Sequence, residues 1–121
     1  MLLSGDYEPL VPCFQKIDVR QFVLEYATPR AGDVDVVGKA LSNREIGLGV
    51  VNPRTEEIES VQTIVRNAER ALKYFRPEQI FLNPDCGFGC FANRCVNDEE
   101  SAAQKVRNIV KAARTLREKH G

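Results

Sequence analysis

The sequence lacks an excess of charge and has no long apolar run. Lys plus Arg and Asp plus Glu number 17 each, so the formal net charge is zero. A nucleic-acid-binding arm or a membrane-binding patch would need a basic excess. No apolar run approaches the roughly 20 residues that span a bilayer, and residues 1–6 lack the basic start and the apolar stretch of a signal peptide. We therefore expect a cytoplasmic protein that binds neither nucleic acid nor membrane.

Internal repeats, low-complexity tracts and linker-like segments are also lacking. The 121 residues are therefore expected to form one domain, 1–121. Hydrophobic residues make up 43% and charged residues 28%, which is typical of a soluble globular protein. In a cytosolic protein, the four cysteines indicate thiols or metal ligands rather than disulfides.

Three short apolar runs have the length and composition of strands. They cover residues 21–25, 46–51 and 80–83. β-branched and aromatic residues lead in them, and their nearly continuous apolar character is typical of parallel strands buried on both faces.

Longer segments with helical periodicity separate these runs. Helices are expected at 7–17, where Pro12 disturbs the pattern, at 34–41, at 61–75 and from about residue 97 to the end. In the last helix, Asn97 is a candidate N-cap with Glu100 as its capping-box partner. Its expected buried stripe consists of Ala103, Val106, Ile109, Val110, Ala113 and Leu116.

The resulting order, α-β-α-β-α-β-α, predicts an α/β fold built from βαβ units. Three such strands fit either a small doubly wound sheet or part of a (β/α)8 barrel, and periodicity does not choose between them. In both architectures the functional face lies at the carboxyl ends of the strands.

Chemically active side chains follow each predicted strand. The first strand ends at Glu25, the second leads to Asn52 and Arg54, and the third leads to the segment Asn83-Pro84-Asp85-Cys86. Parallel pairing would bring a carboxylate, a guanidinium and a thiol together at one edge of the sheet.

Each of these side chains has an ordinary alternative role. Cys86, between a strand and Gly87, suits a zinc ligand but also a small buried residue. Glu25 follows three apolar residues and must be paired, metal-bound or solvated, with Arg20 or Arg30 as possible partners. Arg54 could bind a carboxylate or phosphate.

The remaining candidates are weaker. Arg54 could instead pair on the surface with Glu56 or Glu57. The cluster Cys86-x3-Cys90-x4-Cys95 fits neither structural zinc pairs nor ferredoxin runs, so Cys90 and Cys95 are taken as incidental thiols. A small cysteine-based redox or metal protein stays an alternative. Cys13 is expected in the core, and the single histidine, His120, on a frayed surface end.

At its three strand ends the sequence resembles the catalytic domain of cobalamin-independent methionine synthase and its shorter relatives. The residues that carry the resemblance are Asn83-Pro84-Asp85-Cys86-Gly87, Val23-Leu24-Glu25 and Glu45-Ile46-Gly47-Leu48-Gly49-Val50, and it covers nearly the whole chain. The resemblance implies the last three βα units of a (β/α)8 barrel.

The same resemblance implies a zinc-dependent methyltransferase. In that family a thiol substrate such as homocysteine binds zinc as a thiolate and attacks the methyl group of a methylated folate. It implies that Glu25 and Cys86 are zinc ligands, that Asp85 is a catalytic residue, and that Asn52, Arg54 and Asn83 bind substrate.

Two departures from the family pattern accompany the resemblance. The His-x-Cys motif that supplies the family's other zinc ligands is absent, and Asn52-Pro53-Arg54 stands where the synthases carry Asp-x-His. We therefore expect a truncated domain that is inactive alone and that forms a homo-oligomer or is completed by an upstream barrel fragment. The alternative is a non-catalytic pseudo-enzyme or ligand-binding module.

Overall fold

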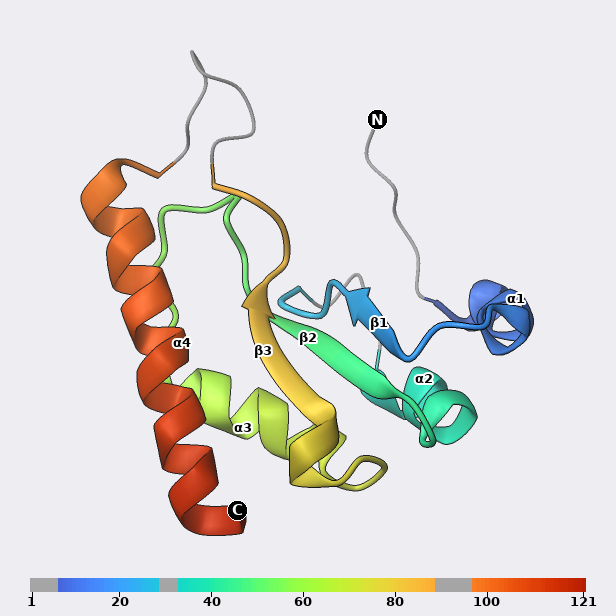
Figure 1. Ribbon diagram of the computed structural model, residues 1–121. Helices are drawn as coiled ribbons and strands as arrows, with labels where there is room; N and C mark the ends of the chain where they lie inside the picture. Colours follow the sequence, from blue (N-terminus) through green and yellow to red (C-terminus); the bar gives the residue numbers. More distant parts are fainter. Residues whose placement is uncertain (1–6, 29–32, 89–96) are drawn as a thin grey trace.

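A three-stranded parallel sheet forms the centre of the molecule (Figure 1). The computed structural model describes residues 7–28, 33–88 and 97–121. The strands, in spatial order, are β1 (Gln21–Leu24), β2 (Glu45–Val51) and β3 (Ile80–Pro84). Phe22 lies beside Ile46, and Ile46 lies beside Ile80. The predicted α/β class is confirmed, and each strand falls within a residue of its expected bounds.

The helices also follow the predicted order. They are η1 (Glu8–Leu10), α1 (Val11–Lys16), α2 (Val34–Leu41), α3 (Val61–Ala71), η3 (Pro77–Gln79) and α4 (Glu99–His120). The single helix expected over 7–17 was wrong, because the segment divides into a 3-10 turn and a short α-helix. Pro12 lies in the first turn of α1, where its missing N–H costs no helical hydrogen bond.

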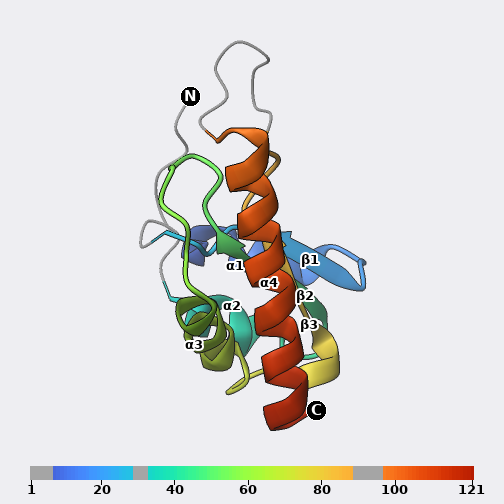
Figure 2. The same ribbon diagram turned by 90° about the vertical axis from the view of Figure 1, so that its left-hand side faces the viewer.

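One face of the sheet packs against helices and forms the core. Figure 2 shows α2 and α3 together on one side of the strands. The buried side chains of this core include Phe22, Leu24, Val37, Leu41, Ile46, Leu48, Val50, Ile64 and Ala68. Alternate residues of each strand point to this face, as the period of two in a strand requires.

The opposite face of the sheet exposes apolar side chains. Val23 is 63% and Phe81 47% exposed, and both pair with Gly47 in register, so the three form a row across the sheet. Gly47 has no side chain, and Val23 Cγ2 and Asn83 Oδ1 each lie 2.9 Å from the place where its Cβ would stand. Val23 and Phe81, on either side of it, stay exposed. This uncovered sheet face (Val23, Gly47 and Phe81) therefore offers an apolar surface.

The long helix α4 begins one residue later than expected. Its N-cap is Asp98, whose carboxylate accepts a hydrogen bond from the Ser101 N–H at 2.7 Å. Asn97, the predicted N-cap, is buried instead and donates its amide to the Pro53 carbonyl at 2.8 Å. Both residues have capping side chains, so the tertiary contact of Asn97 decided the boundary.

The expected buried stripe of α4 was only partly right. Ile109 is buried, but Val106 and Val110 are 43% and 44% exposed, while Lys105 and Asn108 are buried. The helix is rotated so that polar side chains, rather than valines, face the segment between β2 and α3.

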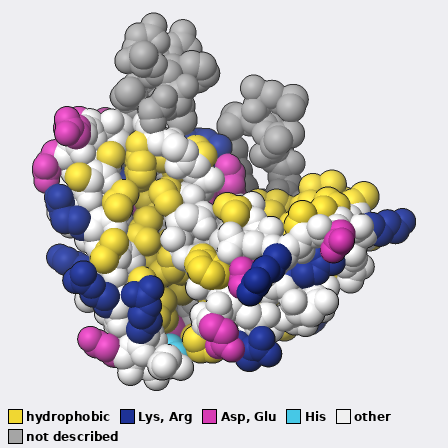
Figure 3. Space-filling view, viewed as in Figure 1, with side chains coloured by type: hydrophobic (Ala, Val, Ile, Leu, Met, Phe, Trp, Pro, Cys, Tyr) yellow, Lys and Arg dark blue, Asp and Glu magenta, His cyan; other side chains and the backbone are white. Residues whose placement is uncertain are grey.

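An apolar groove of about 560 Å³ runs between α4, α3 and β3. Figure 3 shows hydrophobic side chains gathered along this part of the surface. The groove is lined by Leu72 of α3, Phe81 and Leu82 of β3, and Val110, Ala113 and Leu116 of α4. Val110, Ala113 and Leu116 of the predicted stripe therefore line this groove, whereas Val106 does not.

The placement of Cys13 and His120 differs from what the sequence predicted. Cys13, expected in the core, is exposed on α1, because the short helix presents that position to solvent. His120 belongs to α4 and its Nε2 lies 2.9 Å from the Glu69 carboxylate, so the helix end is tied to α3. None of the helices in the described ranges is both long and apolar enough to cross a bilayer.

The contribution of the Asp98 cap to the stability of the fold is expected to depend on pH. The hydrogen bonds from Ser101 lower the pKa of Asp98 below its ordinary value. A lowered pKa means that the charged cap stabilises the fold above the unfolded-state pKa, near 4, and that this contribution is lost as pH falls through the folded-state pKa. Asp98→Asn keeps a capping acceptor without the charge, and Asp98→Ala removes both.

We expect thermal unfolding at pH 7 to rank the wild type above Asp98→Asn and both above Asp98→Ala. The gap between the wild type and Asp98→Asn should close as the pH is lowered below about 4. A gap of constant size across that range would contradict the assignment.

Candidate functional site

The loops after the three strands meet at the carboxyl edge of the sheet. Glu25 follows β1, Arg54 follows β2, and Asp85 and Cys86 follow β3. These four residues are called the strand-end site below. Since β2 lies between β1 and β3, side chains from the outer strands approach each other across the end of the middle strand.

The backbone of Glu25 is held by a tyrosine from the N-terminal segment. The Tyr7 hydroxyl accepts a hydrogen bond from the Glu25 N–H at 2.8 Å and donates one to the Glu25 carbonyl at 3.2 Å. Burial raises the pKa of Tyr7, and the nearby negative charges of Glu25 and Asp85 act in the same direction. The tyrosine therefore stays protonated and fixes the position from which the Glu25 carboxylate projects.

The Glu25 carboxylate forms an ion pair with Arg54. The guanidinium Nη2 and Glu25 Oε1 are 3.3 Å apart, and the two side chains are 48% and 44% exposed. Of the partners considered from the sequence, Arg20 pairs with Glu45 instead, and no ion pair joins Arg54 to Glu56 or Glu57 in the described structure. Arg30 lies outside the described residues. The two candidates therefore pair with each other, while half of each side chain stays open to solvent.

The other two members of the strand-end site, Asp85 and Cys86, affect the pKa of Arg54. Its pKa is raised, first by the hydrogen bond to Glu25 and then by the charge of Glu25, with smaller effects from Cys86 and Asp85. The guanidinium therefore lies within electrostatic range of both Cys86 and Asp85. Cys86 itself is half-buried.

Asp85 reaches back across the sheet to the loop after β1. Its Oδ1 accepts hydrogen bonds from the Tyr26 and Ala27 N–H groups, each at 3.1 Å. Its own N–H donates to the Val51 carbonyl at 2.8 Å. Burial raises the pKa of Asp85 and Glu25 adds to this, whereas the two amides and Arg54 oppose it.

Gly49 makes room for this reach. A Cβ at Gly49 would collide with Asp85 Oδ1 and lie 2.9 Å from the Leu24 carbonyl. Any side chain here would push the Asp85 carboxylate away from the amides of Tyr26 and Ala27. The glycine in the middle strand is therefore a requirement of the strand-end site, a role that was not inferred from the sequence.

The two asparagines predicted to bind substrate have contacts within the protein. Asn52 Oδ1 accepts a hydrogen bond from the Arg54 N–H at 3.0 Å, which forms a tight local turn. Asn83 Nδ2 donates to the Pro84 carbonyl at 2.9 Å. Both side chains shape their loops, and their substrate contacts stay a prediction.

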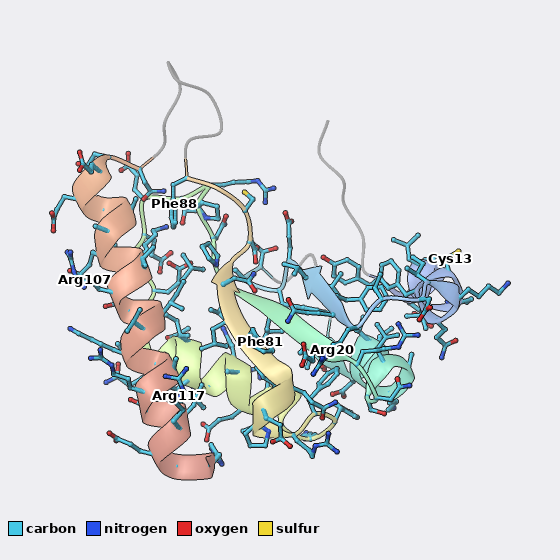
Figure 4. All side chains as sticks on the ribbon, viewed as in Figure 1. Cys13, Arg20, Phe81, Phe88, Arg107 and Arg117 are labelled. Carbon is cyan, nitrogen blue, oxygen red and sulfur yellow. The ribbon has the colours of Figure 1, made fainter. Side chains whose placement is uncertain are left out.

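The other cysteines do not join the strand-end site within the described structure. Figure 4 shows Cys13 on α1, beyond β1 and far from the end of β3. Cys90 and Cys95 lie outside the described residues, so the cluster with Cys86 is untested. Phe88, two residues after Cys86, packs against the hydrophobic core.

The described residues do not fit a complete zinc site. In residues 7–28, 33–88 and 97–121, no three His, Cys, Asp or Glu side chains are grouped closely enough to hold a metal ion. Catalytic zinc normally has three protein ligands and one exchangeable position. Glu25 and Cys86 could supply two donors, and Glu25 is shared with Arg54.

Several residues with contacts in or near the loops of the strand-end site were not singled out from the sequence. Lys105 and Asn108 of α4 were hidden because a helical lysine and asparagine ordinarily face solvent. Glu59 and Tyr7 lie in segments without a strong pattern. Gly47 and Gly49 alternate in an apolar strand, and that spacing was the one available signal.

Sequence comparisons identify the family. The model described as "Cobalamin-independent synthase, Catalytic domain" matches residues 3–115. A methionine synthase of Pyrococcus abyssi is 40% identical over 93% of this chain and 31% of its own length. One from Pyrococcus horikoshii is 38% identical over the same shares. The chain thus spans about a third of the length of these relatives.

A solved structure shows the same fold. It is a B12-independent methionine synthase from Shewanella sp. W3-18-1 in complex with selenomethionine. It matches with a TM-score of 0.80 at 16% identity, over 95% of this chain and 32% of that one. Because the family model covers nearly the whole sequence, the chain belongs to the cobalamin-independent methionine synthase family, as part of its catalytic domain.

Proposed function

We propose that this chain is the part of a methyltransferase catalytic domain that contributes Glu25, Arg54, Asp85 and Cys86 to the active site. The supporting observation is the Arg54 guanidinium, which pairs with Glu25 and responds electrostatically to both Asp85 and Cys86. Residues from three separate strand ends therefore share one small region, as active sites of parallel α/β folds do.

The proposed reaction moves a methyl group from the nitrogen of a methylated folate to the sulfur of homocysteine. A sulfur–carbon bond forms, the nitrogen–carbon bond breaks, and the folate nitrogen takes up the proton that the thiol loses. Asp85, whose pKa is raised by burial, is suited to exchanging a proton near the site. Arg54 is half-exposed and can bind the carboxylate of an amino-acid substrate.

Zinc is the proposed cofactor, and this chain supplies two donors for it. A carboxylate from Glu25 and a thiolate from Cys86 are both normal zinc ligands, and zinc bound there would favour the thiolate form of a substrate thiol. Further donors must come from outside the described residues, since those residues contain no third candidate in range. Zinc and Arg54 would share the carboxylate of Glu25, whose Oε1 is the oxygen that pairs with Arg54.

The proposed complete fold is a (β/α)8 barrel in which the uncovered sheet face points inward. Three features support this proposal: helices cover the other face, Val23 and Phe81 are exposed, and both outer strands have a free edge among the described residues. Additional strands, from a second copy or from a polypeptide that supplies the rest of the barrel, would cover this surface.

A non-catalytic role is the second candidate. It is favoured by the described residues, in which no three potential ligands are grouped and Glu25 is already paired with Arg54. In that case the same fold would bind a ligand or a partner without methyl transfer. Zinc binding and its dependence on Cys86 separate the two candidates.

For the zinc proposal, we expect Cys86→Ser to weaken zinc binding. Loss of residues that merely support metal ligands costs roughly 10–100-fold in affinity, so loss of a ligand should cost at least about tenfold. Competition with a chromophoric chelator under reducing conditions measures this. Glu25→Gln should weaken binding as well.

Cys13→Ser is the matched control, because Cys13 is exposed on α1. Unchanged zinc affinity in Cys86→Ser would remove Cys86 from the ligand set. A loss that occurs instead in Cys90→Ser or Cys95→Ser would favour the cysteine-cluster alternative.

For Asp85, we expect the variant Asp85→Asn to gain stability relative to the wild type as the pH rises. Its folded-state pKa is raised above the unfolded value, so the ionised group lowers stability as pH rises through the folded-state pKa. Asp85→Asn removes this penalty. Urea unfolding should therefore show the variant gaining stability relative to the wild type between about pH 4 and pH 7.

Asp18→Asn, which removes the carboxyl charge of an exposed residue, is measured alongside as the control. A stability difference between wild type and Asp85→Asn that stays flat, or that falls with pH, would contradict the effect of burial on this carboxyl.

For the uncovered sheet face, we expect self-association. Light scattering coupled to size-exclusion chromatography should give a mass above that of a monomer, rising with concentration. Phe81→Lys should shift the protein towards monomer because it places a charge in the apolar row. Val106→Lys, on α4 at a similar exposure, should not. A monomer at all concentrations would count against the proposal.

A further inference from the structure

A lysine is completely buried between α4 and the loop that carries Arg54. Lys105 has no exposed side-chain surface, although it bears a charge. Transfer of an unpaired ammonium into a protein interior is costly, so such a group persists only with several partners. Lys105 is the first buried residue of α4, and an apolar residue would pack there at no such cost.

Among the described residues, the polar partners of Lys105 lie in the segment between β2 and α3. Its Nζ donates hydrogen bonds to the carbonyls of Asn52 and Thr55, each at 2.7 Å. It also lies 3.7 Å from Glu59 Oε1. The two carbonyls stand on either side of Arg54 in the chain. The lysine therefore fixes the backbone before and after the residue that pairs with Glu25.

Glu59 completes the arrangement from within the loop. Its Oε2 accepts a hydrogen bond from the Asn52 N–H at 2.7 Å, so Asn52 is held through both its N–H and its carbonyl. Asn108 of α4 donates to the Glu59 carbonyl at 2.9 Å. Asn97 donates to the Pro53 carbonyl. The polar face of α4 and the residue before its cap thus anchor this loop at four carbonyls.

The Arg54 side of the strand-end site has little other support. Arg54 itself is exposed, and residues 54–58 have no regular secondary structure in the described chain. Backbone carbonyls of such a loop need partners, and α4 provides them from side chains that reach inward. The direction of the Arg54 guanidinium consequently depends on contacts made by a helix that does not touch Glu25.

We propose that Lys105 is a positioning residue that locks the loop of residues 52–59 and thereby holds Arg54 against Glu25. This geometry is independent of the reaction, and only its catalytic purpose rests on the proposed function. The hydrogen bonds and the ion pair of Lys105 go to Asn52, Thr55 and Glu59 of this loop. The lysine acts through the backbone on both sides of Arg54.

The test compares Lys105→Met with the wild type by amide hydrogen exchange and by NMR of the arginine side chains. Met retains most of the packing volume without the ammonium. Lys111→Met, an exposed lysine of the same helix, is the matched control. We expect exchange of the Asn52 and Arg54 amides to become at least about tenfold faster in Lys105→Met, as loss of hydrogen bonds to a charged group implies.

Two results together would support the proposal. The amides of β2 and α3 should keep their protection, which shows that the loop opens locally. The Arg54 guanidinium resonances, slowed in exchange by the ion pair in the wild type, should broaden or vanish in Lys105→Met and persist in Lys111→Met. A purely structural lysine would lower protection throughout the core and leave those resonances in place.

The opposite results would overturn it. Unchanged loop exchange in Lys105→Met, or unchanged Arg54 resonances, would show that the lysine does not position the arginine. If Lys105→Met does not fold, Lys105→Gln is measured in its place because it retains a shorter donor. Failure of both to fold would assign Lys105 to global stability and likewise reject the proposal.

A separate arm addresses the proposed function. Homocysteine binding in the presence of zinc is measured by calorimetry on the complete barrel that contains this chain. No binding would count against the proposed methyltransferase role, whereas the exchange and resonance results decide the role of Lys105 without any ligand.

Discussion

The carboxylate of Asp85 joins the ends of all three strands. It starts from the end of β3, passes over Gly49 of β2, and accepts hydrogen bonds from backbone amides that follow β1. Each step depends on the previous one, because the reach is possible only if the middle strand has no side chain at that place. The positions of Glu25 and Cys86, which flank the two ends of this connection, follow from it.

The fold was largely predictable because its strands and helices have strong local patterns. Buried parallel strands are apolar along their length, and α2 was predicted with the same bounds that the structure has, Val34–Leu41. The errors came from tertiary contacts. Asn97 was drawn away from the helix cap by the Pro53 carbonyl, and α4 turned its valines outward because Lys105 and Asn108 face the loop. No periodicity in a single helix encodes either choice.

The site was predictable in part. Strand topology alone brings the carboxyl ends of neighbouring strands together, so the meeting of Glu25, Arg54 and Asp85 followed from their sequence positions. The pairing between Glu25 and Arg54 was not foreseen, because arginine has many acidic neighbours and sequence distance favoured Glu56 or Glu57. Supporting residues were the least predictable, since Tyr7 and Lys105 act on backbone groups that carry no sequence signal.

The Tyr7 hydroxyl has a consequence for any strand added beside β1. The Arg20 carbonyl accepts a bond from Glu45 of β2, so by alternation the peptide groups of Glu25 face the other, outer side of β1. Tyr7 already occupies both of them. A strand added beside β1 could therefore form backbone hydrogen bonds with Gln21 and Val23. It could not do so with Glu25 unless the Tyr7 side chain moved away. Tyr7 thus limits how far an added strand can pair with β1, and the Glu25 carboxylate stays outside the paired region.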